Sequence, residues 1–132
     1  MAIPIKAPAL LMGTLLVTGC ASAPADGLDA RNNLHCAVAL WFTGQYAERM
    51  RADVEQRRTY FVGNSWYTQL VPEGAFETPE ARQALVKAKA APPAVEPVAR
   101  ACIDRASRQA GFAGFRRRIG AVYDQADAER ER

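Results

Sequence analysis

Hydrophobic and polar positions alternate with helical spacing along most of the chain after residue 29. Over residues 29–49 most positions on both sides of a helix are apolar: Leu34, Val38, Trp41 and Gln45 lie on one side, and Cys36, Ala39, Leu40, Thr43 and Ala47 lie on the other. A helix that is apolar around most of its circumference is usually buried. The pattern therefore predicts a central helix here, with a continuation through Met50 and Val54 toward Arg58.

Residues 59–68 fit two different structures. Two β-prone runs separated by Gly63 and Asn64 are typical of a β-hairpin, although an isolated hairpin is marginally stable unless a helix covers it. Alternatively, Asn64 or Ser65 caps a short helix that ends before Pro72. We favour the helix.

Cap and breaker residues predict two further helices. After a turn at residues 72–74, Thr78 followed by Pro79 is a helix-start signature, and the helix is expected to reach about residue 90. Prolines at positions 92 and 93 then break the chain. The next helix is expected over residues 97–109, with Gly111 at its end and Cys102 pointing inward.

The last predicted helix carries its apolar residues on one stripe, as a helix docked on a core does: Phe112, Phe115, Ile119, Val122, Tyr123 and Ala126. This helix is expected to end in a charged tail at residues 128–132. Together the elements predict an all-α fold, a small bundle of four to five short helices that forms a single domain over residues 30–127.

The N-terminal segment has a different character. An apolar stretch of 13 residues, 7–19, follows Lys6, and it is shorter than the roughly 20 residues that span a bilayer. We therefore interpret it as the apolar region of a signal peptide. The stretch closes with Leu-Val-Thr-Gly-Cys at residues 16–20, which resembles the lipobox of bacterial lipoproteins, where a small residue precedes the cysteine that becomes lipidated.

The resemblance implies removal of residues 1–19, lipidation of Cys20 and a tether over residues 20–29. It implies a location in the bacterial cell envelope, with the acyl anchor in the membrane. By the lipoprotein sorting rule, Ala21 at the second mature position implies the periplasmic face of the outer membrane. The alternative is an ordinary secretory cleavage after Ala25, which would discard Cys20.

Both interpretations export the protein and leave Cys36 and Cys102 available for pairing. In an oxidising compartment, two such cysteines favour a disulfide bond over a metal or redox site. We expect this bond to join the first and fourth helices. In the chain-entropy model it would stabilise the domain by roughly 4 kcal/mol.

Charge and composition add little to the prediction of function. Cleavage before Cys20 leaves 113 residues with 16 basic and 14 acidic side chains, a net charge of +2. So small an excess does not indicate a nucleic-acid partner, which an exported protein would seldom meet. Arginine outnumbers lysine; arginine suits the recognition of phosphate or carboxylate, but we attribute the excess to genomic base composition.

No motif points to catalysis, a metal or a cofactor. His35 is the single histidine, which excludes a multi-histidine metal site and a catalytic triad. On a helix it diverges from the adjacent Cys36, so the two do not form a nucleophile and its base. The carboxylates include no isolated pair of the kind that glycosidases use.

Three residues remain as candidate contacts for a ligand or a partner: Trp66, Tyr67 and Arg117. The aromatic segment 60–67 has the composition of a ligand pocket, although we favour core packing in so small a protein. Arg117 faces outward in the run of arginines at 116–118 and would suit anionic envelope groups. The stems of its two neighbours are expected to cover the edge of the core.

We therefore expect a non-enzymatic envelope lipoprotein with a structural or protein-interaction role. Its partner would be another envelope protein or the cell wall. The alternative is a periplasmic protein that binds a small ligand with the aromatic segment from Tyr60 to Tyr67.

Overall fold

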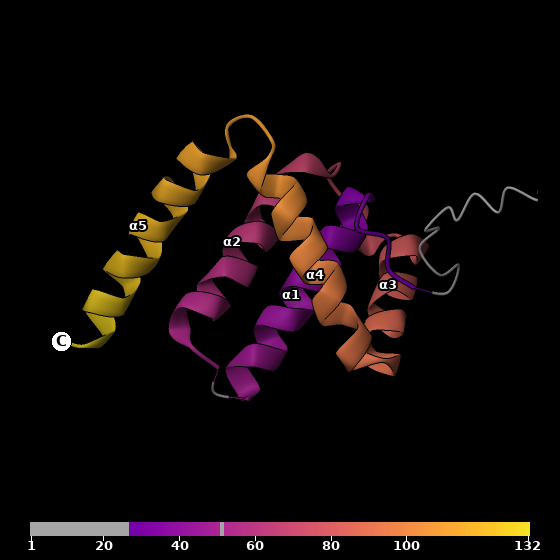
Figure 1. Ribbon diagram of the computed structural model, residues 1–132, viewed down its shortest axis with the longest axis horizontal. Helices are drawn as coiled ribbons and strands as arrows, with labels where there is room; N and C mark the ends of the chain where they lie inside the picture. The colour runs from indigo at the N-terminus through magenta and orange to yellow at the C-terminus, as the bar shows by residue number, and fades with distance from the viewer. Residues whose placement is uncertain (1–26, 51) are drawn as a thin grey trace, which may run out of the picture.

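The computed structural model describes residues 27–50 and 52–132. The elements of this part are α1 (Asn33–Arg49), α2 (Val54–Leu70), the short 3-10 helix η1 (Ala75–Glu77), α3 (Pro79–Ala90), α4 (Pro92–Ser107) and α5 (Phe112–Arg130) (Figure 1). No strand occurs among the described residues, so the all-α prediction is confirmed and residues 59–68 are helical. None of these helices is long and apolar enough to cross a membrane.

α1 lies at the centre of the bundle, between α2 and α3, with α4 packed across it (Figure 1). Its buried residues occupy most sides of the helix, as the sequence predicts for a central element. The helix begins at Asn33 rather than at residue 29. The reason is the cap at Asn32, whose side chain accepts hydrogen bonds from the backbone N–H groups of Leu34 and His35.

The predicted continuation of α1 beyond residue 49 is wrong. α1 ends at Arg49, and α2 starts at Val54 behind the N-cap Asp53. The Asp53 carboxylate accepts hydrogen bonds from the backbone N–H groups of Glu55 and Gln56. This second cap allows the chain to reverse, and α2 runs back antiparallel to α1 (Figure 1).

The predicted helix start at residue 64 or 65 is also wrong, because both residues lie inside α2. Asn64 does not cap a helix; its side-chain amide donates to the carbonyl of Ala37 on α1 at 2.8 Å. The preceding Gly63 allows close packing, since a Cβ there would lie 2.4 Å from Cδ1 of Ile103 and 3.0 Å from Cδ1 of Leu40. Local sequence signals cannot reveal such contacts between helices.

The prediction for α3 is confirmed, with Thr78 as its N-cap and Pro79 in its first turn. α4 differs, because it begins at Pro92 rather than at residue 97 and ends at Ser107. Prolines in the first turn of a helix cost no hydrogen bond, since the N–H groups there have no intrahelical acceptor. The two prolines therefore mark the start of α4, and Pro97 lies within it.

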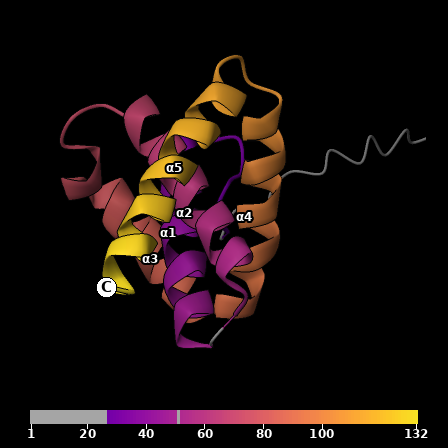
Figure 2. The same ribbon diagram turned by 90° about the vertical axis from the view of Figure 1, so that its left-hand side faces the viewer.

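α5 lies on the outside of the bundle, over α2 (Figure 2). Gly111 precedes it with a φ of 88°, a left-handed conformation that favours glycine. Phe112 and Phe115 are buried, whereas Val122 is 61% exposed. The predicted apolar stripe is therefore fully buried only at its start, while Ile119 and Tyr123 pack against the core partly buried.

The last helix also extends further than the sequence suggests. α5 continues to Arg130, so most of the predicted charged tail at residues 128–132 is helical. Arg58 on α2 donates hydrogen bonds to the carboxylates of Asp124 and Asp127. These ion pairs hold the second half of α5 near α2.

The predicted tether, residues 20–29, is shorter than expected. Leu28 is buried in the main core, and the backbone N–H of Asp29 donates to Nδ1 of His35 at 3.0 Å. Both residues therefore belong to the folded part. The rest of the tether, residues 20–26, lies outside the described residues.

Candidate functional site

The predicted disulfide bond is present and joins α1 to α4. The Sγ atoms of Cys36 and Cys102 lie 2.12 Å apart and their Cα atoms 5.6 Å apart, within the roughly 7 Å that a disulfide requires. Neither residue is exposed. The bond therefore lies inside the core and serves the fold.

Tyr67 lies beside this bond. Its hydroxyl donates to the backbone carbonyl of Cys102 at 2.6 Å, and the guanidinium carbon of Arg105 lies 4.8 Å from its ring centroid. Burial raises the pKa of the Tyr67 hydroxyl, and the positive charge of Arg105 offsets part of that rise. Tyr67 therefore acts as a protonated hydrogen-bond donor within the core.

Trp66 lies in the core as well. Its ring packs edge-to-face against both Phe112 and Phe115, with centroid distances of 5.3 Å in each pair. Its indole N–H donates to Oε1 of Gln109 at 2.6 Å. The structure thus places Trp66 and Tyr67 in internal packing, away from any surface where a ligand or partner would meet them.

Arg117 is exposed on α5, as are Arg116 and Arg118. Within the part of the chain that the structure describes, none of these three guanidinium groups lies within 4.0 Å of a carboxylate. Contact of Arg117 with an anionic envelope group stays a prediction.

His35 connects three segments of the chain. Its Nδ1 accepts a hydrogen bond from Asp29, and its Nε2 lies 3.6 Å from Oε1 of Glu80 on α3. Both ring nitrogens of His35 therefore face groups of the fold, and neither of these contacts is with a nucleophile. Over the described residues, no group of three His, Cys, Asp or Glu side chains is arranged to hold a metal ion.

An apolar groove lies where α1, α2, η1 and α3 meet. We call it the apolar groove; it encloses about 360 Å³ and is lined by Ala37, Val38, Trp41, Asn64, Thr68, Phe76, Ala81 and Leu85. Trp41 and Phe76 are each 44% exposed, while Ala37, Val38 and Ala81 are buried. The groove therefore presents two large aromatic side chains to solvent above a closed apolar floor.

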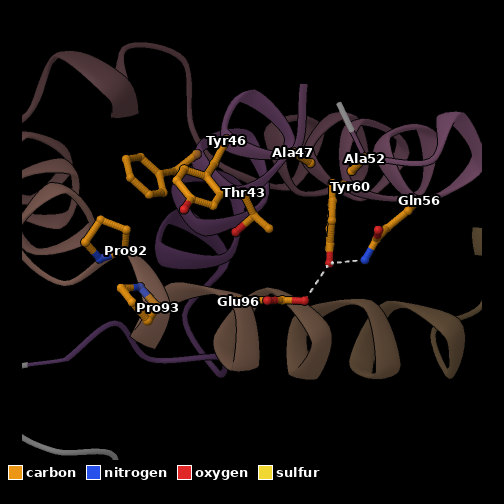
Figure 3. Close-up of a pocket in the computed structure, with 10 residues that line it drawn as sticks. Thr43, Tyr46, Ala47, Ala52, Gln56, Tyr60, Pro92, Pro93 and Glu96 are labelled. Atoms are coloured by element: carbon orange, nitrogen blue, oxygen red, sulfur yellow. Dashed lines mark hydrogen bonds between the residues drawn. The ribbon is translucent and has the colours of Figure 1, made fainter. Parts of the chain in front are cut away.

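A second cleft lies between α1, α2 and the start of α4, and it differs in chemistry. We call it the hydroxyl cleft; it encloses about 370 Å³ and is lined by Phe42, Thr43, Tyr46, Ala47, Ala52, Gln56, Tyr60, Pro92, Pro93 and Glu96 (Figure 3). The Tyr60 hydroxyl donates to Oε1 of Glu96 at 3.4 Å and accepts from Nε2 of Gln56 at 3.4 Å. Three helices thus bring hydroxyl, amide and carboxylate groups to one opening.

Sequence reasoning missed both openings. Of the aromatic segment 60–67, Tyr60 lines the hydroxyl cleft, Phe61 is partly buried, and Trp66 and Tyr67 lie in the core. Trp41 shares a helix side with Gln45, which is the one local sign that this side is not fully buried. Phe76 carries no such sign, because it lies in a short turn element outside any periodic pattern.

Cys20, the predicted lipidation site, lies outside the described residues. Comparisons with models of known families, with characterised proteins and with solved structures give no match to this chain.

Proposed function

We propose that the chain is a non-enzymatic lipoprotein of the bacterial envelope that docks a protein partner in the apolar groove. The attachment would be the lipidated Cys20, at the periplasmic face of the outer membrane. One observation carries the docking proposal: two large aromatic side chains, Trp41 and Phe76, are each 44% exposed at the same concave surface. Contiguous exposed apolar surface of this kind is typical of an interaction site.

The polar side chains of the groove support an apolar occupant. The Asn64 amide donates to the Ala37 carbonyl at 2.8 Å, and the Thr68 hydroxyl donates to the Asn64 carbonyl at 2.8 Å. The Thr68 hydroxyl hydrogen and one of the two Asn64 amide hydrogens are therefore already bonded within the protein. A polar group of a partner that entered the groove would lose its water without gaining these donors in exchange.

The size of the groove fits one or two apolar side chains of a partner protein. Tryptophan is enriched among the residues that dominate interface energies, and covering apolar surface contributes roughly 25 cal/mol for each Å² removed from water. The disulfide bond and the capped start of α1 hold Trp41 on a rigid element. Little ordering would thus be needed when the partner binds.

Trp41→Ala is expected to abolish a specific crosslink between the groove and its partner while leaving the melting temperature within a few degrees of the parent. A photo-reactive amino acid placed at the exposed position 68, on the rim of the groove, would form the crosslink in intact cells. The measurement is the appearance of a crosslinked band with and without the Trp41 change.

Val86→Ala serves as the matched control, since Val86 is an exposed apolar residue that does not line the groove. It should leave the crosslink intact. A crosslinked product of twice the chain's mass would identify a second copy as the occupant. A band that persists in Trp41→Ala would contradict docking through the aromatic pair.

The anchor is tested separately. Cys20→Ser is expected to move the protein from the membrane fraction to the soluble fraction, or to leave an uncleaved precursor, because serine provides no thiol for lipidation. Metabolic labelling with a fatty acid, followed by fractionation, measures both effects. Labelling that is unchanged in this variant would refute the lipobox interpretation without affecting the groove.

A further inference from the structure

The hydroxyl cleft contains a buried polar group without a partner. Thr43 is 7% exposed, and its hydroxyl has no hydrogen-bond partner among the described residues. Two other helical threonines behave differently: the hydroxyls of Thr59 and Thr68 donate to the carbonyls of Glu55 and Asn64, four residues earlier. The Thr43 side chain instead extends from α1 into the cleft (Figure 3).

A buried hydroxyl without a partner costs stability, so its presence calls for an explanation. Thr43 contributes to the lining of a cleft large enough for a small molecule, since such sites usually enclose about 300 to 1,000 Å³. A ligand that supplies the missing hydrogen bond in this cleft would explain why a threonine is buried there.

The other polar groups of the cleft indicate which hydrogen-bonding groups that ligand would carry. Within the described chain, no hydrogen bond engages the Tyr46 hydroxyl, the amide oxygen of Gln56 or the second carboxylate oxygen of Glu96. The Gln56 and Glu96 oxygens are acceptors, and the hydroxyls of Thr43 and Tyr46 act as donors or acceptors. They therefore match a molecule that carries several hydroxyl groups.

Charge favours an uncharged ligand. Among the residues that the structure describes, Glu96 is the one formally charged residue that lines the cleft, and Nη2 of Arg100 donates to its Oε1 at 2.6 Å. An anion would approach this carboxylate at an electrostatic cost. A cation would compete with a guanidinium that is already in place. A neutral molecule meets neither penalty.

The remaining walls are apolar and include one aromatic ring and two proline rings. Phe42, Pro92 and Pro93 line the cleft together with two alanines. The flat phenyl ring of Phe42 and the apolar ring carbons of the two prolines offer apolar surface for contact with the carbon-bound hydrogens of a saturated ring. We propose that the hydroxyl cleft binds a small uncharged ring with several hydroxyl groups, such as a single sugar unit, and that Thr43 is a hydrogen-bonding contact for it.

This inference is independent of the apolar groove. Its test is a titration of the full-length protein in detergent with D-glucose, D-galactose and N-acetyl-D-glucosamine, followed by NMR chemical shifts of the cleft residues. At least one sugar should cause saturable shifts at millimolar concentration. Choline and inorganic phosphate, as small charged probes, should cause none.

Thr43→Val keeps the shape of the side chain and removes the hydroxyl. It should weaken sugar binding about tenfold, the effect of one hydrogen bond, and it should melt no lower than the parent without sugar because it removes an unsatisfied group. Thr59→Val is the matched control, because the Thr59 hydroxyl is bonded within its own helix and the residue lines neither opening; this variant should bind like the parent.

Three results would overturn the inference. One is the absence of saturable shifts with every sugar, and another is choline or phosphate binding as strongly as the best sugar. The third is a Thr43→Val variant that folds normally and binds the sugar as tightly as the parent does.

Discussion

Replacement of Phe115 by alanine is expected to lower the free energy of unfolding by about 3 to 5 kcal/mol. Phe115 is 9% exposed and packs edge-to-face on Trp66, with a centroid distance of 5.3 Å. Removal of the ring would leave a cavity where α5 meets α2 and would end that aromatic contact. Urea denaturation followed by tryptophan fluorescence and by circular dichroism measures the loss.

Val122→Ala is the matched control on the same stripe. Because Val122 is 61% exposed, this change should alter the free energy of unfolding by no more than about 0.5 kcal/mol. If Phe115→Ala instead unfolded at the same urea concentration as the parent, Phe115 would not be part of the core, and α5 would become a candidate partner surface.

Removal of the disulfide bond is expected to cost about 4 kcal/mol, as the chain-entropy model gives for a loop of this length. Cys36 and Cys102 are 66 positions apart in sequence, so the bond restricts a large part of the unfolded chain. The double variant Cys36→Ala/Cys102→Ala is the direct test, measured by urea denaturation. A loss of this size approaches the whole stability of many small domains.

Each single variant, Cys36→Ala or Cys102→Ala, should lose nearly as much as the double variant, because either one opens the loop. Native alkylation of the parent without reductant should modify neither sulfur. A double variant with the unfolding midpoint of the parent would show that the bond contributes no stability.

The two proposed binding surfaces use different chemistry and different faces of α1. The apolar groove has exposed aromatics and polar side chains that already donate hydrogen bonds within the protein, which suits apolar side chains of a partner. The hydroxyl cleft has an unsatisfied buried hydroxyl and a carboxylate that is already paired with Arg100, which suits a neutral hydroxyl-bearing ring. A change in one surface should leave binding at the other intact.

The sequence alone was sufficient for the features that depend on local chemistry. Thr78 followed by Pro79 predicts the start of α3 because a cap and a first-turn proline act within a few residues. The largely apolar circumference of residues 29–49 predicts a central helix because a helix that is packed on most of its sides carries few polar residues. The pairing of Cys36 with Cys102 follows because, of the three cysteines, Cys20 is expected to be lipidated or removed and the other two lie in a compartment expected to be oxidising.

The tertiary structure decided what depends on neighbouring elements. Trp41 and Trp66 have the same side chain on similar helices, yet one is 44% exposed and the other 8%, because α5 covers Trp66 and no described element covers Trp41 to the same extent. The hydroxyl cleft joins residues from 42 to 96 in sequence. The packing of the helices against one another determines which faces remain exposed. The spacing of residues within one helix does not predict that packing.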